Sequence, residues 1–158
     1  IAGSRLHVVI VGRGPRARQG RERVQQLGMG NNVHIIGPIP HSEIHLLHNI
    51  ADIFVLPSIP RKYWQEQFGI VLIESMACGK AIVTTCSGSI PDVLGDSGVL
   101  VQPNDHYSLY LTLKKLILDS DLREQLGKKA RDRALHHFST KVIAEKLNNA
   151  YLSVLNRT

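Results

Sequence analysis

Five short apolar runs, separated by longer segments of mixed polarity, constrain the fold of this chain more than any other feature. They are His7–Val11, Val33–Gly37, Asp52–Leu56, Ala81–Thr84 and Gly98–Val101. Runs this short, rich in β-branched residues and followed by turn residues, are typical of strands buried on both faces. Strands that alternate with helical segments predict an α/β fold, with an open parallel sheet covered by helices on both faces.

The segments between the runs carry helix signals. Arg16 to Leu27 ends at Gly28, a typical residue after a helix C-terminus. Ser42 is a candidate N-cap for a short helix through Asn49. Residues 68 to 76 form a helix that is apolar on nearly every side. The remaining predictions are a short helix that ends at Leu94 and three final helices, whose candidate N-caps are Asp105, Ser120 or Asp121, and Ser139.

The length of 158 residues suits one domain, which we predict to span residues 1–158. No apolar run approaches the roughly 20 residues that cross a bilayer, and the start of the chain lacks the pattern of a signal peptide. The two cysteines, Cys78 and Cys86, are too few for a disulfide scaffold, and free thiols predict a reducing, cytoplasmic location. In a parallel sheet of this kind, ligands bind at the carboxyl ends of the strands.

The net charge of +6 favours an anionic partner, such as nucleotide phosphates, nucleic acid or a membrane surface. Aromatic residues make up only 5% and are not interleaved with the basic ones, which argues against nucleic acid. We interpret the basic clusters at 13–23 and 128–133 as solvated helix faces, with peripheral membrane contact as the second interpretation. His41, His45 and His48 are interpreted as helix surface, so no metal site is predicted.

Residues Gly12, Gly14 and Ala17 fit the pattern G-x-G-x-x-A of a dinucleotide-binding turn. That pattern also requires an acidic residue after the next strand, where this chain has Ile36-Gly37. We therefore favour a tight strand-to-helix turn. An NAD-dependent oxidoreductase remains an alternative function.

The most informative segment runs from Glu66 to Glu74 and holds two carboxylates with seven residues between them. We expect Glu66 just before a helix and Glu74 about two turns inside it, on the order of 10 Å along the axis. Free amides at a helix start favour anions, and Gly69 lets a phosphate approach the backbone. A carboxylate in an apolar helix needs partners, which ribose hydroxyls or a nearby cation would supply.

Several motifs together resemble the GT4 family of retaining glycosyltransferases, from about His7 to Tyr151. They are Pro57-Ser58, the E-x7-E segment continued to Lys80, the segments 88–93 and 98–101, and Pro103-Asn104-Asp105. The resemblance implies a GT-B fold, in which two Rossmann-like domains face each other. This chain looks like the C-terminal, donor-binding domain, without that domain's first strand and helix.

The resemblance also implies roles for individual residues. Glu66 corresponds to the residue near the donor sugar, and we predict it to be catalytic. Glu74 corresponds to the ribose-binding residue. The backbone after the second run would frame the base, and the segment around the Phe-Gly pair would bind the diphosphate. The residues of these two groups are Gly37, Pro38 and Ile39, and Gln67, Phe68, Gly69, Ile70 and Val71.

The predicted function is therefore a hexosyltransferase domain that binds a nucleoside diphosphate sugar for retaining transfer. Its partners would be that donor and an N-terminal acceptor domain of the same protein, with no cofactor and no metal. In the family, an Arg and a Lys on an earlier strand and helix bind the diphosphate. The resemblance begins after those elements, so we expect the isolated piece to be inactive, and whether the whole protein keeps the pair stays open. A non-catalytic GT-B-like binding module is a further alternative, and a GT-B epimerase ranks below transfer.

Overall fold

The computed structural model describes residues 6–156 of the chain. The fold consists of two compact units, one that ends at Ile44 and one that begins at His45, and each is described by itself. We expected one domain over residues 1–158, and that expectation stays a prediction.

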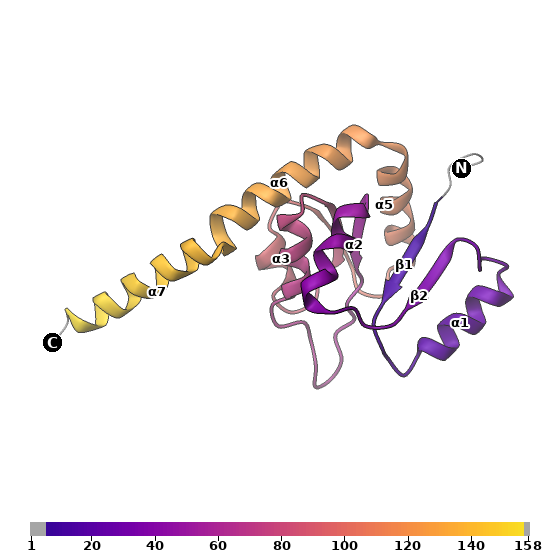
Figure 1. Cartoon of the computed structure of the whole chain (residues 1–158), viewed down its shortest axis with the longest axis horizontal. Coiled ribbons are helices and arrows are strands. Elements are labelled where there is room, and N and C mark those ends of the chain that lie inside the picture. The colour runs from indigo at the N-terminus through magenta and orange to yellow at the C-terminus, as the bar shows by residue number, and fades with distance from the viewer. Residues whose placement is uncertain (1–5, 157–158) are drawn as a thin grey trace. The chain divides into compact units, whose positions relative to one another are not determined.

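The first unit contains a parallel pair of strands joined by a helix. Strand β1 (Val8–Val11) pairs in parallel with β2 (Val33–Ile36), and helix α1 (Ala17–Gln26) connects them (Figure 1). Gly28 follows α1 with a φ of 65°, the left-handed conformation expected after a helix. The Arg21 guanidinium donates to the carbonyl of Ile35 at 2.8 Å, which ties α1 to β2.

Strand β1 is not buried, although its apolar run predicted that it would be. Its four side chains are between 38% and 48% exposed. Within its described residues 6–44, the first unit has two strands and one α-helix of its own, and that helix packs on β2. One helix cannot cover both faces of a sheet, so the apolar side chains of β1 lack the two covering layers that such a run requires.

The second unit is built on a three-stranded parallel sheet with the order β3-β4-β5. The strands are β3 (Ile53–Leu56), β4 (Ala81–Thr85) and β5 (Val99–Val101). The central strand β4 is buried along its whole length. The predicted parallel pairing is thus confirmed within each unit, and the carboxyl ends of β3, β4 and β5 meet at one edge.

Helices cover both faces of this sheet, as predicted. On one face Ile82 packs with Leu72, Met76 and Leu94, from α3 (Ile70–Ala77) and α4 (Ile90–Leu94). On the other face Val83 packs with Leu116 of α5 (His106–Leu118). The remaining helices are α2 (Ile44–Ile50), α6 (Ser120–Phe138) and α7 (Thr140–Leu155), with a short 3₁₀ helix η1 (His41–Glu43) before α2.

Helix α6 holds the ends of α3 and α4 through a basic cluster that we interpreted as solvated. The Arg131 guanidinium donates to the carbonyl of Ala77 at 2.6 Å, at the end of α3. Arg133 donates to the carbonyls of Val93 and Asp92 at 2.8 and 2.7 Å, at the end of α4. These arginines satisfy carbonyls that a helix end leaves without partners. Arg131 is exposed, as the solvated interpretation expects, whereas Arg133 is half-buried and departs from it.

The helix caps agree only in part with the sequence signals. Asp105 caps α5, as predicted, and accepts from the amide of Ser108 at 2.9 Å. The cap of α6 is Asp119, which accepts from Leu122 at 2.9 Å, one residue before the predicted Ser120. Ser42 lies inside η1 and caps nothing, because the helix begins with a 3₁₀ turn after Pro40.

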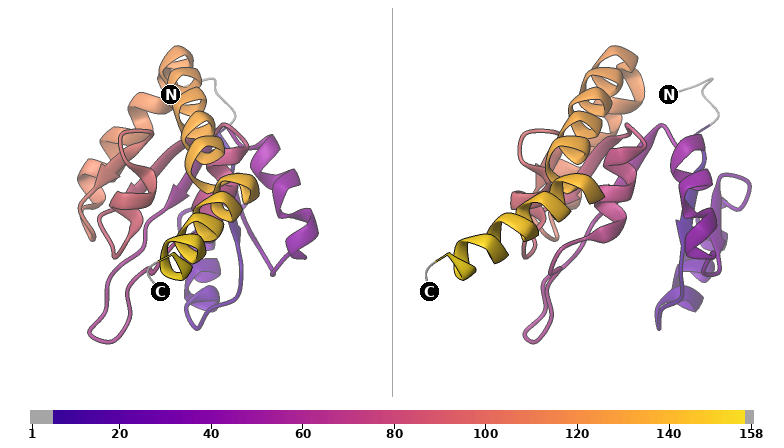
Figure 2. Two further views of the ribbon diagram at one scale, coloured as in Figure 1. Left: turned by 90° about the vertical axis from the view of Figure 1, so that its left-hand side faces the viewer. Right: turned by 60° about the vertical axis from the view of Figure 1, so that its left-hand side comes forward.

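Helix α7 extends away from the sheet of the second unit (Figure 2). Ser139 is its N-cap residue by position, but no side-chain hydrogen bond caps it. Among the helices of residues 6–156, none combines the length and the apolar character that crossing a membrane requires.

Candidate functional site

The carboxyl ends of β3 and β4 carry two loops that together form the candidate site. The loop after β3 covers residues 57–69, and the loop after β4 covers residues 86–89. Two hydroxyls tie the strand ends together: Thr84 Oγ1 donates to the carbonyl of Leu56 at 2.7 Å, and Thr85 Oγ1 to that of Ser58 at 2.5 Å. The start of the longer loop is therefore fixed to the central strand.

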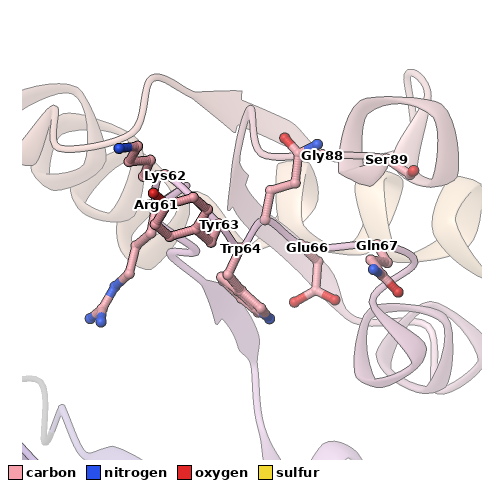
Figure 3. Close-up of a pocket in the computed structure, with 9 residues that line it drawn as sticks. Arg61, Lys62, Tyr63, Trp64, Glu66, Gln67, Gly88 and Ser89 are labelled. Carbon is pink, nitrogen blue, oxygen red and sulfur yellow. The ribbon is translucent and has the colours of Figure 1, made fainter.

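The longer loop folds into a small hairpin that carries basic and aromatic side chains. Arg61 and Trp64 exchange both backbone hydrogen bonds, at 2.7 and 3.1 Å. The Lys62 ammonium lies 5.0 Å from the centre of the Tyr63 ring. An open hollow of about 760 Å³ lies between this hairpin and the second loop, and it is lined by residues 61–67 together with Gly88 and Ser89 (Figure 3).

Glu66 is fixed at both its backbone and its side chain. Its carbonyl accepts from the amide of Ser89 at 3.1 Å. Its carboxylate Oε1 accepts from the amide of Gly69 at 3.2 Å. Figure 3 shows the carboxylate between Trp64 and Gln67. Glu66 thus precedes the first residue of α3 by four positions, and its carboxylate reaches the N-cap residue Gly69, which puts its negative charge at the positive end of the helix.

The loop after β4 approaches Glu66 so closely that only glycine fits at position 88. A Cβ atom placed on Gly88 would lie 1.7 Å from the carbonyl oxygen of Glu66, and the φ of Gly88 is 55°. Sequence analysis assigned no role to Gly88 beyond the family motif. A Gly between two serines indicates a turn, but the close approach of another loop leaves no local sequence signal.

Helix α3 starts later than its apolar pattern predicted. Gly69 is the N-cap residue with a φ of 70° and a ψ of 58°, and this left-handed conformation excludes residues 68 and 69 from the helix. Glu74 is therefore about one turn inside α3, roughly 6 Å along its axis, and not about two turns inside. The Phe68 ring packs edge-on against Phe138 of α6, with ring centres 6.0 Å apart.

The backbone amides at the start of α3 are not equally available to a ligand. The Gly69 amide donates to Glu66, so it is already occupied in this structure. Ile70 and Val71 belong to the first turn of α3, where an α-helix supplies no internal acceptor for the N–H groups. Their amides can bind an anion, and Ile70 is 65% exposed.

Glu74 lies on the side of α3 that meets α2. Its carboxylate Oε2 is 3.9 Å from Nε2 of His48, and its side chain is 24% exposed. We interpreted His48 as helix surface together with His41 and His45, and for His48 that was wrong, because it is only 5% exposed. The signal was present in the sequence: His48 follows Ile44 by four residues, which places both on one helix face.

Gly37, Pro38 and Ile39 follow β2 in the first unit. The structure brings Glu66, Gln67, Phe68, Gly69, Ile70, Val71 and Glu74 together in the second unit. A common site for both groups stays a prediction. In the first unit the amide of Ala17 donates to the carbonyl of Gly14 at 3.0 Å, and Gly12 has a φ of 130°. These are features of the tight strand-to-helix turn that we favoured.

Between residues 6 and 156, no three or more His, Cys, Asp or Glu side chains come together in a group that could hold a metal ion. The absence of a metal or cofactor from the reaction stays a prediction.

Comparison with solved structures shows the same fold. A sucrose-phosphate synthase from Thermosynechococcus elongatus is 27% identical with a TM-score of 0.79, over 95% of this chain and 39% of that one. Anabaena HepE, solved in complex with UDP, has a TM-score of 0.83 at 21% identity, over 94% of this chain and 41% of that one. These likenesses confirm the predicted class, in which parallel sheets are flanked by helices as in GT-B glycosyltransferases.

Comparison of sequences shows the family. A D-inositol 3-phosphate glycosyltransferase of Corynebacterium jeikeium is 36% identical over 80% of this chain and 29% of its own length. An N-acetyl-alpha-D-glucosaminyl L-malate synthase of Bacillus anthracis is 29% identical over 94% of this chain and 38% of its own length. The chain thus spans about a third of the length of these relatives. Residues 2–133 match the family model of glycosyl transferases group 1, and the chain belongs to that family.

Proposed function

We propose that this chain is the donor-binding part of a retaining hexosyltransferase that uses a nucleoside diphosphate sugar and no metal ion. The observation that carries the proposal is the arrangement of Glu66 over the start of α3, beside an open hollow, with Glu74 one turn further along the helix. The sugar hydroxyls would bind the carboxylate of Glu66, and the diphosphate would bind the amides at the start of α3. The ribose would bind the carboxylate of Glu74.

The chemistry of transfer fits these groups. As the bond between sugar and diphosphate breaks, negative charge grows on the leaving diphosphate and positive charge grows on the sugar. The amides of Ile70 and Val71, together with the helix dipole, stabilise the first charge. The carboxylate of Glu66 stabilises the second. Neither group requires a metal, which supports the metal-independent form of the proposal.

The relatives support this substrate class. Two of them are named for the transfer or joining of sugars, and Anabaena HepE has been solved with UDP and with UDP-glucose. Because the chain spans about a third of its curated relatives, we propose that an N-terminal domain of the same protein supplies the acceptor site. We propose a cytoplasmic location, and the net charge of +6 supports contact with anionic membrane surfaces.

A titration of the full-length protein tests the proposal. UDP, GDP, ADP and NAD are titrated into the wild type, Glu74→Gln and Glu145→Gln; Glu145 is an exposed carboxylate on α7 and serves as the control. We expect one diphosphate to bind, Glu74→Gln to weaken it and Glu145→Gln to leave it unchanged. Binding of NAD in preference to every diphosphate would reassign the function to an oxidoreductase.

A turnover measurement separates an enzyme from a binding module. The full-length protein and its Glu66→Ala variant are incubated with the nucleotide sugar of the selected base, and release of the nucleoside diphosphate is followed. We expect a sharp loss of release in Glu66→Ala. A wild type that binds the diphosphate but releases none with any sugar or acceptor would indicate a non-catalytic module.

A further inference from the structure

The inference concerns His48, a buried imidazole in contact with the proposed ribose carboxylate. His48 is 5% exposed, and its ring packs edge-on against Phe54 of β3, with ring centres 5.2 Å apart at 67°. Within residues 6–156 its buried Nε2 has no hydrogen-bond partner. A buried polar nitrogen without a partner is costly, so its placement calls for an explanation.

Within the described residues 6–156, the carboxylate that faces this nitrogen is that of Glu74, at 3.9 Å from Nε2 to Oε2. Burial lowers the pKa of His48, the charge of Lys80 lowers it further, and Glu74 opposes both. Lys80 is itself fixed, because its Nζ donates to the carbonyl of Asn49 at 2.9 Å. The imidazole is therefore neutral at pH 7 and has one N–H to donate.

We propose that His48 is the positioning residue of Glu74: when a nucleotide occupies the site, Nε2–H donates to Oε2 and directs the other carboxylate oxygen toward the ribose hydroxyls. The inference rests on the proposed function, because it assumes that Glu74 binds ribose. The distance must shorten from 3.9 Å to about 3 Å, which a rotation of the carboxylate achieves. Hydrogen bonds of this kind often tighten only in the bound complex.

A neutral histidine suits this task better than a cation. A lysine or arginine at this position would pair with Glu74 and offset its charge, which weakens the carboxylate as an acceptor. A neutral donor orients the carboxylate and leaves its charge in place, and a hydrogen bond from a ribose hydroxyl to a charged oxygen is stronger than one to a neutral oxygen. The aromatic contact with Phe54 holds the ring plane in the required direction.

The test compares two substitutions that differ in where they place an N–H. The side-chain amide of His48→Gln reaches the position of Nε2, whereas that of His48→Asn reaches only the position of Nδ1. His45→Gln, on the exposed side of the same helix, is the matched control. UDP, GDP and ADP are titrated into the full-length variants and the wild type, and inorganic diphosphate serves as a ligand without ribose.

We expect His48→Asn to weaken binding of the selected nucleoside diphosphate about tenfold, while His48→Gln and His45→Gln stay within about threefold of the wild type. Affinity for inorganic diphosphate should not change in any variant. Melting curves first show that the variants fold. If His48 had only a structural role, its substitution would change the affinities for both ligands together or leave both unchanged. Equal nucleotide affinity in His48→Asn and His48→Gln overturns the inference.

A second measurement does not depend on folding of a variant. Nitrogen-15 NMR of the wild type distinguishes the two imidazole tautomers, and we expect His48 to carry its proton on Nε2 and that proton to exchange more slowly after the nucleotide is added. A proton on Nδ1 in the bound state overturns the inference. If no nucleoside diphosphate binds to the wild type, the proposed function fails and this inference fails with it. If Glu74→Gln weakens binding but His48→Asn does not, the proposed function stands and only the role of His48 is refuted.

Discussion

Substitution of Gly88 by alanine tests whether the close approach of two loops holds Glu66 in place. The new Cβ atom would lie 1.7 Å from the carbonyl oxygen of Glu66, and Cβ contacts under 3.0 Å do not persist. The two backbones must therefore separate by at least about 1.3 Å. The hydrogen bond from Ser89 to the same carbonyl, at 3.1 Å, opposes that movement and breaks with it.

The free-energy cost of Gly88→Ala has two parts. Alanine in the left-handed conformation costs about 1–2 kcal/mol, because the φ of Gly88 is 55°. Displacement of Glu66 costs in addition the hydrogen bonds that we propose between its carboxylate and the donor sugar, about 1.5–3 kcal/mol. The second part appears as a loss of roughly 10- to 100-fold in affinity for the nucleotide sugar.

Gly79→Ala is the matched control, because it also places alanine in a left-handed conformation but does not displace Glu66. Gly79 has a φ of 67°, but the nearest atom to its added Cβ is 3.7 Å away, an ordinary contact. For a protein of this size each kcal/mol lowers the melting temperature by about 2–4 °C. We expect both variants to melt lower and only Gly88→Ala to lose affinity in a titration with the nucleotide sugar. Equal affinity in the two variants would refute the argument.

Two further predictions concern stability. Gly127→Ala, in the interior of α6, should destabilise the protein, because the new Cβ would lie 2.2 Å from the carbonyl oxygen of Gly79. This clash should outweigh the gain of up to about 1 kcal/mol that alanine usually brings over glycine in a helix. A higher melting temperature in the variant would show that the contact yields easily. The free energy of unfolding should fall as the pH drops below about 6.5, since burial lowers the pKa of folded His48 and the unfolded chain then binds more protons. Urea titrations from pH 5 to 8 measure this dependence, and His48→Gln should remove the contribution of His48. An unchanged pH dependence of stability in the variant would contradict the lowered pKa of His48.

The sequence predicted those features that depend on local pattern. Five strands appear where the five apolar runs lie, and every strand end agrees within one residue, since β-branched runs between turn residues have few other stable conformations. The pair Glu66 and Glu74 was predicted from spacing and family motif, and the carboxylate of Glu66 does reach the N-cap residue of α3. The start of that helix was missed by two residues, because apolar pattern does not report the left-handed conformation of Gly69.

Features that depend on contacts between distant segments could not be predicted in this way. Arg131 and Arg133 were placed in a solvated cluster, since a run of charges on a helix does not reveal which carbonyls lie opposite it. The fit of Gly88 against Glu66 joins residues that are 22 positions apart, and it has no local signature. His48 is intermediate: its position on the face of Ile44 indicated burial, but the carboxylate that it faces comes from another helix.

The capping bond of Glu66 leads to a prediction that distinguishes two kinds of ligand. In this structure the carboxylate of Glu66 accepts the Gly69 amide at 3.2 Å, at the helix end where the diphosphate is proposed to bind. A carboxylate there competes with the diphosphate for the amide and repels its charge. We propose that the same carboxylate turns to the sugar hydroxyls when the sugar is present, which ends the competition.

Glu66→Gln should therefore change the two affinities in opposite directions. The neutral amide removes the repulsion, so a nucleoside diphosphate without sugar should bind more tightly, by a few-fold to about tenfold for roughly 1 kcal/mol. The matching nucleotide sugar should bind less tightly, because hydrogen bonds to a charged carboxylate are stronger than those to an amide. Parallel titrations of both ligands into the wild type and the variant measure the ratio of affinities. If both affinities fall together, Glu66 supports the site only structurally, since neither repulsion nor sugar binding would then distinguish the ligands.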